Sequence, residues 1–336
     1  MRSRDDSAHP PSAHPFSRLD PDAILNALQA AGWQADGRLL ALNSYENRVY
    51  QIWLDDGGII VVKFYRPQRW SDEQILEEHR WSQMLADHGL PAVAPVEREG
   101  QTLHHHEGWR FSVSPRRGGR APELDDPSTL ERIGLLMGRM HALGGRPLFR
   151  VRPSLDVPTL GREPRDWLLE HAAIPASLLP AWRAVADACL EAVQTQIDGI
   201  AQVRTLALHG DCHAGNILWT DEGPHFVDFD DARNGPAVQD LWMLLSGHPQ
   251  EMQVQLAPLL RGYQRACEFD ARELALIEPL RTLRLLHYSA WIARRWDDPA
   301  FPQAFPWFGT ERYWQDRILE LREQLGAMAE PPLQMP

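Results

Sequence analysis

Four polar residues of this 336-residue chain have types and spacing that suit phosphoryl transfer. Asp211 and Asn216 stand five positions apart in the segment LALHGDCHAGNILW, a predicted loop between two short apolar strands. Asp228 follows at the end of another strand, and Lys63 ends the apolar strand GGIIVVKF. Phosphoryl transfer needs little covalent chemistry from the protein, but it needs a hydroxyl, a phosphate and a metal ion held in fixed positions, with positive charge near the phosphate. Carboxylates, an amide and an ammonium group serve those tasks.

The sequence around Asp211 matches the catalytic loop of protein kinases, whose pattern is HRDxxxxN. By that match, Asp211 would accept or orient the proton of the acceptor hydroxyl, and the amide oxygen of Asn216 would bind one metal ion. Asp228 stands where kinases present the carboxylate that joins magnesium to the phosphates of ATP. We therefore expect Asp228 to be both a catalytic residue and a metal ligand.

Lys63 is the only lysine among the 34 basic residues of the chain. Exposed lysines exchange for arginine at little cost, whereas a compact ammonium in a confined site cannot become a planar guanidinium. A charged residue at the end of an apolar strand must also reach water or find a buried partner. The kinase comparison implies that Lys63 contacts the α- and β-phosphates of ATP and is paired with a helix glutamate, Glu78 as first choice and Glu77 as second.

Spacing alone carries little weight, because an Asp, an Asn five residues later and a further Asp occur by chance in many acidic chains. Order and context carry more weight. A lysine on a hairpin strand, a glutamate on the next helix, HGDxxxxN between short strands and then VDFD follow one another here as they do in kinases.

The segments HGDCHAGNILW and FVDFDDARNGPAVQDLW resemble the aminoglycoside phosphotransferase and choline kinase superfamily, whose Brenner motif is HGDxxxxN. Within that superfamily, SYENRVYQ, VVKFYRP, QILEEHRW and RRWDDPAFP resemble the bacterial stress-response kinases over nearly the whole chain. The resemblance implies the α+β class and a bilobal protein-kinase-like fold, with an N-terminal antiparallel sheet and helix and a mainly α-helical C-terminal lobe. It also implies a cytoplasmic serine/threonine protein kinase that uses ATP and Mg²⁺ and phosphorylates protein hydroxyls, its own included.

The loop NSYENRV departs from ordinary protein kinases, because it lacks the GxGxxG motif that lets a backbone approach the triphosphate closely. The resemblance implies that Ser44 to Asn47 still cover the phosphates, so Ser44 is a candidate nucleotide contact. It further implies that His209 holds the backbone of the catalytic loop and that Asp240, in VQDLW, anchors this loop from a helix.

Residues 1–19 and residues 20–114 differ in composition and in the periodicity of their apolar residues. Residues 1–19 are rich in Pro, Ser, His and charge without periodicity, which predicts a mobile arm. Residues 20–114 predict the nucleotide-binding lobe, in which a short helix precedes an antiparallel meander with a hairpin turn at 55–58. A capping box formed by Ser71 with the glutamine three positions later starts the helix that carries Glu77 and Glu78, and two more strands follow it.

Residues 115–330 predict a second lobe that is mainly α-helical and carries the catalytic and metal-binding loops. Short strands are expected at TLALHGD, NILW and HFVDF, around those loops. Helices are expected at residues 126–144, 179–198, 250–267 and 271–296.

Composition narrows the classes of partner. The formal charge of −12 gives no reason to expect nucleic acid or a membrane surface as a partner, since both require clustered Lys and Arg. The chain has no apolar run of the roughly 20 residues that cross a bilayer and no signal-like stretch at its start, so we expect a cytoplasmic protein. Cys189, Cys212 and Cys267 show neither CxxC spacing nor an even number, which argues against disulfides and a zinc cage.

The same residues would serve two other functions. A kinase for small molecules such as an aminoglycoside, choline or a homoserine-like hydroxyl is the first alternative, and the acidic balance suits cationic acceptors. A nucleotide-binding scaffold without turnover is the second. The sequence leaves open the acceptor, the oligomeric state and any activating phosphorylation. It also leaves open whether Asp230 and Asp231 hold a second ion, bind a cationic substrate or lie in solvent.

Overall fold

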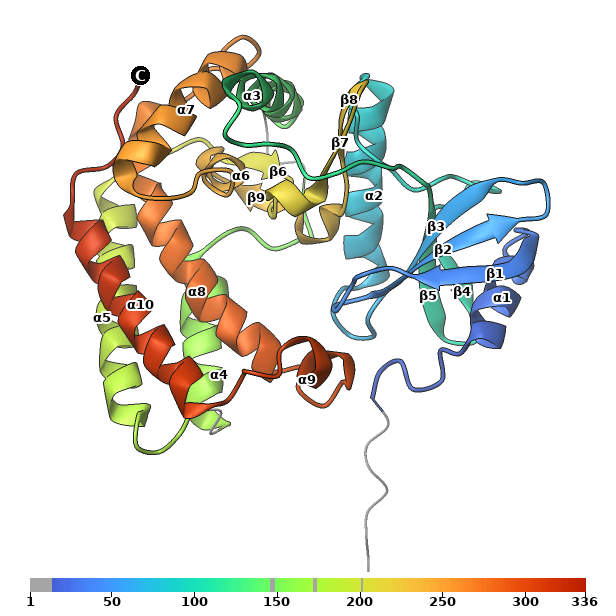
Figure 1. Ribbon diagram of the computed structural model, residues 1–336, viewed down its shortest axis with the longest axis horizontal. Helices are drawn as coiled ribbons and strands as arrows, with labels where there is room; N and C mark the ends of the chain where they lie inside the picture. The colour runs from blue at the N-terminus through green and yellow to red at the C-terminus, as the bar shows by residue number, and fades with distance from the viewer. Residues whose placement is uncertain (1–13, 146–148, 172–173, 201) are drawn as a thin grey trace, which may run out of the picture.

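A five-stranded sheet and a set of helices form the two parts of the computed structural model, which describes residues 14–145, 149–171, 174–200 and 202–336. Figure 1 shows the sheet with α1 (Pro21–Ala30) at one end of the molecule, the C-terminal helices at the other, and α2 (Asp72–Asp87) between them. The predicted α+β class, with an N-terminal antiparallel sheet and a helical remainder, is confirmed. None of the described helices is long and apolar enough to cross a membrane.

The N-terminal sheet is antiparallel throughout and has the strand order β1-β2-β3-β5-β4. Its strands are β1 (Ala35–Ala41), β2 (Arg48–Leu54), β3 (Ile59–Phe64), β4 (His104–His106) and β5 (Trp109–Pro115). Gly57 takes a left-handed φ of 85° in the turn between β2 and β3, where the sequence predicts a hairpin.

The two faces of this sheet have different tasks. Ile60, Val62 and Phe64 of β3 point into a core that α1 covers, because side chains alternate along a strand. Val61 and Lys63 therefore point to the opposite face, and the register places Val49 of β2 beside Lys63. The unique lysine thus stands on the face that α1 leaves uncovered.

Of the predicted mobile arm, residues 1–19, the structure describes residues 14–19. Residues 1–13 lie outside the described residues. For residues 14–19 the prediction does not hold at Phe16, which is 5 % exposed and stacks on Trp109 in the core of the sheet. A single aromatic residue in a Pro- and Ser-rich stretch has no periodicity from which its burial could be predicted, yet burying one ring is strongly favourable.

The helix α2 begins as its sequence requires. The Ser71 side chain accepts from the backbone N–H of Gln74, and the Gln74 side chain accepts in return from the N–H of Ser71, so the predicted capping box is confirmed. Glu77 and Glu78 are both buried on this helix. α2 also contacts the short 3₁₀ turn Phe229–Asp231, which directly follows Asp228.

The C-terminal part surrounds two small hairpin-like sheets with helices. β6 (Leu206–Leu208) pairs with β9 (Arg233–Gly235), and β7 (Ile217–Thr220) pairs with β8 (Gly223–Phe226). The helices are α3 (Pro127–Leu143), α4 (Glu163–Glu170), α5 (Leu179–Gly199), α6 (Val238–Trp242), α7 (Pro249–Tyr263), α8 (Ile277–Ala293), α9 (Ala300–Ala304) and α10 (Glu311–Ala329). The predicted helix at 271–296 begins with a 3₁₀ segment, Ala271–Leu276, before α8, and α10 was not predicted.

Two glycines let α3 and α7 approach closely. A Cβ atom at Gly134 would lie 2.0 Å from the carbonyl oxygen of Leu259, and one at Gly138 would lie 2.3 Å from that of Tyr263. No other residue type fits at such distances without moving a backbone. The next turn of α3 carries His141, whose Nδ1 lies 3.0 Å from the Tyr263 hydroxyl.

Candidate active site

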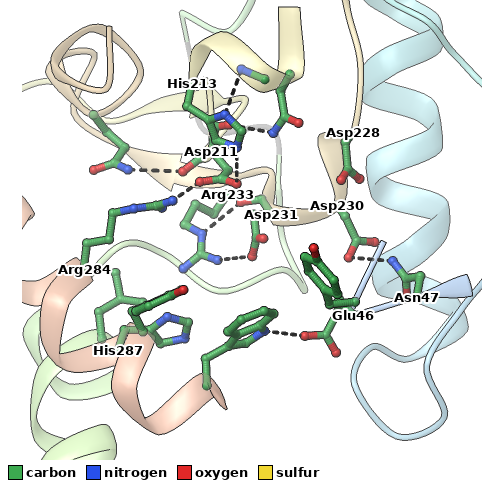
Figure 2. Close-up of a pocket in the computed structure, with 18 of the residues that line it drawn as sticks. Glu46, Asn47, Asp211, His213, Asp228, Asp230, Asp231, Arg233, Arg284 and His287 are labelled. Atoms are coloured by element: carbon green, nitrogen blue, oxygen red, sulfur yellow. Dashed lines mark hydrogen bonds and ion pairs between the residues drawn. The ribbon is translucent and has the colours of Figure 1, made fainter. Parts of the chain in front are cut away.

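The structure brings four of the predicted site residues to one cavity of about 450 Å³ (Figure 2). Asp211, Asn216 and Asp228 all line it, although 17 positions separate the first from the last. Ser44, from the loop between β1 and β2, lines the same cavity. The opposite wall consists of one face of α8, whose cavity-lining residues recur at helical spacing: Leu280, Arg284, His287, Tyr288 and Trp291.

The catalytic loop holds Asp211 and Asn216 toward each other. The Asn216 Nδ2 donates to the backbone oxygen of Asp211 at 2.9 Å, which leaves the Asn216 amide oxygen as an acceptor for a cation. The Asp211 side chain is 23 % exposed, and its Oδ1 accepts from Nη1 of Arg284 at 2.6 Å. A carboxylate at this place can accept a proton, but an arginine already occupies one of its two oxygens.

Asp228 has an unusual backbone. Its φ of 60° and ψ of 64° lie in the left-handed region, which residues other than glycine rarely adopt. Such strain persists where the surroundings impose it, often at functional sites. The Asp228 Oδ1 lies 2.8 Å from Nζ of Lys63, and Asp230 Oδ1 lies 3.9 Å from the same nitrogen. The turn thus brings a carboxylate from the C-terminal part to the unique lysine of the sheet.

The pKa values of this pair follow from its geometry. Enclosure by protein disfavours the charged forms, but the lysine ammonium outweighs that effect and holds the pKa of Asp228 below its ordinary value. In the same way, the carboxylates of Asp228 and Asp230 outweigh burial and raise the pKa of Lys63 well above its ordinary value. Lys63 is therefore a fixed positive charge.

The predicted pairing of Lys63 with a helix glutamate is not what the structure shows. Glu77 accepts from the backbone N–H groups of Arg150, Val151 and Arg152, so it holds a chain segment instead. No ion pair joins Lys63 to Glu78 among the described residues, although the lysine charge does favour the ionised carboxylate. Burial outweighs that influence and raises the pKa of Glu78 to about 7, whereas the more exposed Asp228 keeps its charge and binds the lysine.

The raised pKa of Glu78 predicts a pH dependence of stability. Between pH 4.5 and 7 the folded protein keeps a proton that the unfolded chain releases, so burial of Glu78 costs more as the pH rises through 7. We compare the free energy of unfolding of Glu78→Gln with that of the wild type at each pH. We expect this difference to favour the variant by about 2 kcal/mol more at pH 8 than at pH 5. Urea denaturation at both pH values measures it.

Glu73→Gln, on the exposed face of α2, is the matched control and should show the same difference from the wild type at both pH values. An equal difference at pH 5 and pH 8 for Glu78→Gln would contradict the assignment.

Asp230 and Asp231 are bound by arginines and do not lie free in solvent. Asp230 is 4 % exposed and forms an ion pair with Arg69, and its Oδ2 accepts from Nδ2 of Asn47 at 3.2 Å. Asp231 lies 3.0 Å from Arg69 and 2.8 Å from Arg233. Both carboxylates are therefore paired with arginines within the protein, and Asp230 does not lie in solvent.

Asp240 anchors the catalytic loop, as its place in VQDLW suggests. It is fully buried and accepts from the backbone N–H groups of His209 and Gly210, both at 2.8 Å. Burial alone would raise its pKa, but the hydrogen bond and charge of His141 lower it below the ordinary value. His209 in turn contacts the backbone oxygen of Val227 at 2.9 Å, so the two loops that carry Asp211 and Asp228 are joined.

Asp240→Ala should loosen this loop without touching a substrate. Two buried N–H donors lose their acceptor, so we expect the free energy of unfolding to fall by about 2 to 4 kcal/mol. The phosphoryl transfer rate should fall more than tenfold, because the loop no longer holds Asp211 in its reactive position. The KM for ATP should change little, because the residues proposed to bind the nucleotide stay in place. Thermal denaturation and steady-state kinetics measure both. Asp316→Ala, at an exposed position of α10, is the control; an active, stable Asp240→Ala would contradict the anchoring role.

The residues present fit a nucleotide-dependent magnesium site. Among the residues that the structure describes, no group of three His, Cys, Asp or Glu side chains could hold a metal ion. Mg²⁺ keeps several waters and is commonly bound through one or two protein oxygens together with substrate phosphates. The Asn216 amide oxygen and the Asp228 carboxylate supply two such oxygens at the cavity.

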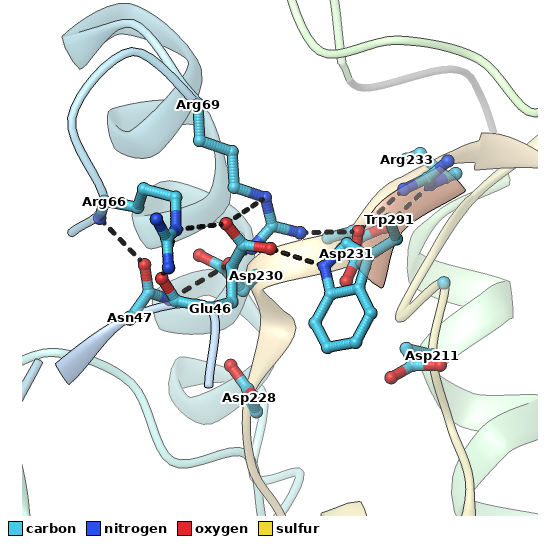
Figure 3. A network of polar contacts seen from close by, with 12 residues as sticks. Glu46, Asn47, Arg66, Arg69, Asp211, Asp228, Asp230, Asp231, Arg233 and Trp291 are labelled. Atoms are coloured by element: carbon cyan, nitrogen blue, oxygen red, sulfur yellow. Dashed lines mark hydrogen bonds and ion pairs between the residues drawn. The ribbon is translucent and has the colours of Figure 1, made fainter. Parts of the chain in front are cut away.

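The loop between β1 and β2 is tied to the C-terminal helices (Figure 3). Glu46 lies 3.0 Å from Arg66 and 2.6 Å from Arg295, and Nε1 of Trp291 donates to it at 2.5 Å. Ser44, next but one to Glu46, donates only to the backbone oxygen of Asn47 at 3.1 Å. Its predicted contact with a nucleotide stays a prediction.

Arg284, Arg69 and Glu46 were not singled out in the sequence. Arg284 lies 73 residues from Asp211, and nothing distinguishes it from the 32 other arginines. The helical recurrence of polar and aromatic residues along α8 is the one signal that would have found it, because that face is too polar for a core.

Comparison with known proteins finds relatives that match nearly the whole chain. The profile of the phosphotransferase enzyme family, APH, matches residues 37–277. Stress response kinase A of Escherichia coli strain K12 is 48 % identical over 324 residues, which cover 96 % of this chain and 98 % of that protein. Serine/threonine protein kinase RdoA of Salmonella typhimurium strain LT2 is 46 % identical over the same shares.

A solved structure of similar fold is that of amicoumacin kinase hAmiN in complex with AMP-PNP, Ca²⁺ and Ami, with a TM-score of 0.71. It is 18 % identical in sequence, and the alignment covers 94 % of this chain and 95 % of that one. This likeness concerns the fold alone. The profile match and the identity to full-length kinases go further: the chain belongs to the phosphotransferase enzyme family, among relatives named stress response kinase A.

Proposed function

We propose that the protein is a serine/threonine protein kinase that transfers the γ-phosphoryl group of ATP to protein hydroxyls with the help of Mg²⁺. The observation that carries the proposal is the meeting of Asp211, Asn216 and Asp228 at one cavity, with Lys63 bound to Asp228. The 46 % identity to a protein named serine/threonine protein kinase RdoA supports the protein acceptor. Residues 20–114 would form the nucleotide-binding lobe and residues 115–330 the catalytic lobe.

Each residue has a task in this proposal. Lys63 and the loop that carries Ser44 bind the phosphates, and the carboxyl group of Glu78 lies close enough to influence the lysine. Val49 and Val61, half-buried on the same face of the sheet as Lys63, offer apolar surface to the adenine ring. Asn216 and Asp228 would hold Mg²⁺, which when bound neutralises charge on the phosphates.

Asp211 acts on the acceptor. Its carboxylate accepts the proton of the hydroxyl as the hydroxyl oxygen attacks the γ-phosphorus. The bond between that phosphorus and the ADP oxygen breaks as the new ester bond forms, and the products are a phosphorylated acceptor, ADP and a proton. Asp240 keeps the loop in place while Asp211 acts.

Labelled ATP with magnesium tests the proposal. Wild-type protein and the Asp211→Ala variant are incubated with one acidic protein, one basic protein and a panel of aminoglycosides, choline and homoserine. Label on protein, the enzyme's own chain included, that is absent for the variant and in excess chelator supports the protein kinase. Label on small molecules alone contradicts it, and an absence of transfer to every acceptor would favour a scaffold.

A further inference from the structure

The cavity offers no unpaired carboxylate among its described lining residues. Each acidic residue there has an arginine or lysine nitrogen within ion-pair distance: Glu46, Asp211, Asp228, Asp230 and Asp231. A cationic acceptor that approached one of these carboxylates would meet the repulsion of the arginine or lysine already bound there. Each acidic side chain of the cavity is therefore accompanied by a positive charge, and the net charge of the whole chain does not describe the place where an acceptor binds.

Arg284 is the cation closest to the proposed reaction. It stands on α8, a helix of 17 residues, and its guanidinium reaches Asp211 (Figure 2). The Arg284 side chain is 44 % exposed, against 23 % for Asp211, so a bound acceptor can reach it. Arg233 lines the same cavity, but two contacts with Asp231 hold it at 2.8 and 2.9 Å. Among the described residues, Arg284 forms an ion pair with Asp211 alone.

A reacting hydroxyl at Asp211 binds directly beside Arg284. The hydroxyl needs an oxygen of Asp211, and Oδ1 already accepts from Arg284 at 2.6 Å. The other oxygen, Oδ2, lies 3.6 Å from Nε2 of His213. An arginine side chain on a rigid helix can move its planar head by a few ångströms while its stem stays in place, and the head then presents several N–H donors to whatever lies beside the hydroxyl.

We propose that Arg284 selects acceptors that carry an anionic group close to the reacting hydroxyl, such as a serine or threonine flanked by Asp, Glu or a phosphorylated residue. This inference rests on the proposed protein kinase function and names its substrate class. With the hydroxyl at Asp211, the guanidinium of Arg284 has further N–H groups that can donate to a neighbouring carboxylate or phosphate in a two-pronged geometry. The same charge repels lysine, arginine and quaternary ammonium groups at that position.

Three serine peptides of equal length test the selection. They differ only in the residues that flank the serine, which are Glu, Gln or Arg, and kcat/KM is measured with labelled ATP and magnesium. A charge-assisted contact predicts that the wild type prefers the Glu-flanked peptide over the Gln-flanked one by about 10- to 100-fold. The Arg-flanked peptide should be the poorest of the three.

Variants assign the preference to one side chain. Arg284→Gln should bring the ratio of kcat/KM for the Glu- and Gln-flanked peptides close to one, whatever its effect on the absolute rate. Arg284→Lys keeps the positive charge but lacks the planar guanidinium with its paired N–H donors. It should therefore show a preference for the Glu-flanked peptide that is weaker than in the wild type. Arg294→Gln removes the same charge from the exposed end of α8, outside the cavity, and should keep the wild-type ratio.

Glycerate and choline, a small anionic and a small cationic alcohol, separate failure of this inference from failure of the proposed function. Label on all three peptides with equal kcat/KM, a preference for the Arg-flanked peptide, or an unchanged ratio in Arg284→Gln overturns the role of Arg284 and leaves the protein kinase standing. Label on the small alcohols without label on peptides overturns the protein kinase. In that case, more label on glycerate than on choline would support selection of anionic acceptors. More label on choline than on glycerate would overturn that selection as well.

Discussion

We expect Asp211→Ala to abolish nearly all phosphoryl transfer and to leave nucleotide binding intact. Loss of the proton acceptor is expected to lower kcat by about 10²- to 10⁴-fold. The Asp211 side chain contacts Arg284 and His213, whereas Lys63 and Asp228 contact each other. The nucleotide contacts proposed for Lys63 and Asp228 should therefore remain in the variant. Single-turnover kinetics with labelled ATP measure the rate, and equilibrium titration with a fluorescent ATP analogue measures the binding.

Asp221→Ala is a matched control for this experiment. It makes the same chemical change at an exposed turn between β7 and β8, five positions after Asn216, and should keep the wild-type rate. If Asp211→Ala transferred phosphoryl groups within tenfold of the wild type, another base would have to be found. If it lost ATP affinity to the same degree as activity, Asp211 would be a nucleotide contact and not the base.

Lys63→Arg is expected to lose activity although it keeps the positive charge. The Lys63 side chain is 18 % exposed and lies between Asp228 and Asp230, at 2.8 and 3.9 Å. A guanidinium is longer and planar, so it displaces the carboxylate that is proposed to hold Mg²⁺. We expect kcat/KM for ATP to fall by about 10- to 100-fold, the amount that one charge-assisted contact supplies. Full activity of Lys63→Arg would refute the argument from the single lysine.

The absence of any other lysine in the sequence makes the site directly addressable. An amine-reactive reagent can modify only the Lys63 side chain and the chain's α-amino group, and ATP with magnesium should protect Lys63. The variant Arg312→Lys, at a position whose side chain is 91 % exposed, introduces a second lysine as an internal reference. Mass spectrometry should find the reference modified equally with and without ATP. Because the raised pKa keeps Lys63 protonated, its modification without ATP should be slow, and equal modification at a measurable rate in both samples would show that nucleotide does not cover it.

Local signals were predictable from the sequence. The capping box at Ser71, the hairpin at residues 55–58 and the strand that ends in Lys63 depend on neighbours a few positions away, and the structure contains all three. The loop around Asp211 was predictable too, because HGDxxxxN matches the catalytic-loop pattern of kinases, and in the structure Asn216 bonds to the backbone oxygen of Asp211. Such features need no knowledge of the rest of the fold.

Contacts between distant segments were not predictable. Whether Glu77 or Glu78 faces Lys63 depends on how α2 is rotated against the sheet, and the sequence does not give that angle. Pairing of Glu46 with Arg295 joins positions 249 residues apart, and many arginines could have filled the second place. The charge at the acceptor side of the cavity is likewise a sum of such pairs, which the net charge of the chain does not reveal.

The close contact between α3 and α7 bears on how sequence variation in this protein will be interpreted. Gly138 allows Tyr263 to approach α3, Tyr263 contacts His141, and His141 contacts Asp240, which holds the catalytic loop. An alanine at Gly138 would move the helix that carries Tyr263 and, through this chain of contacts, the loop itself. A mutational scan scored by activity would therefore mark a buried glycine as if it belonged to the active site, whereas a scan scored by abundance would separate the two groups of positions.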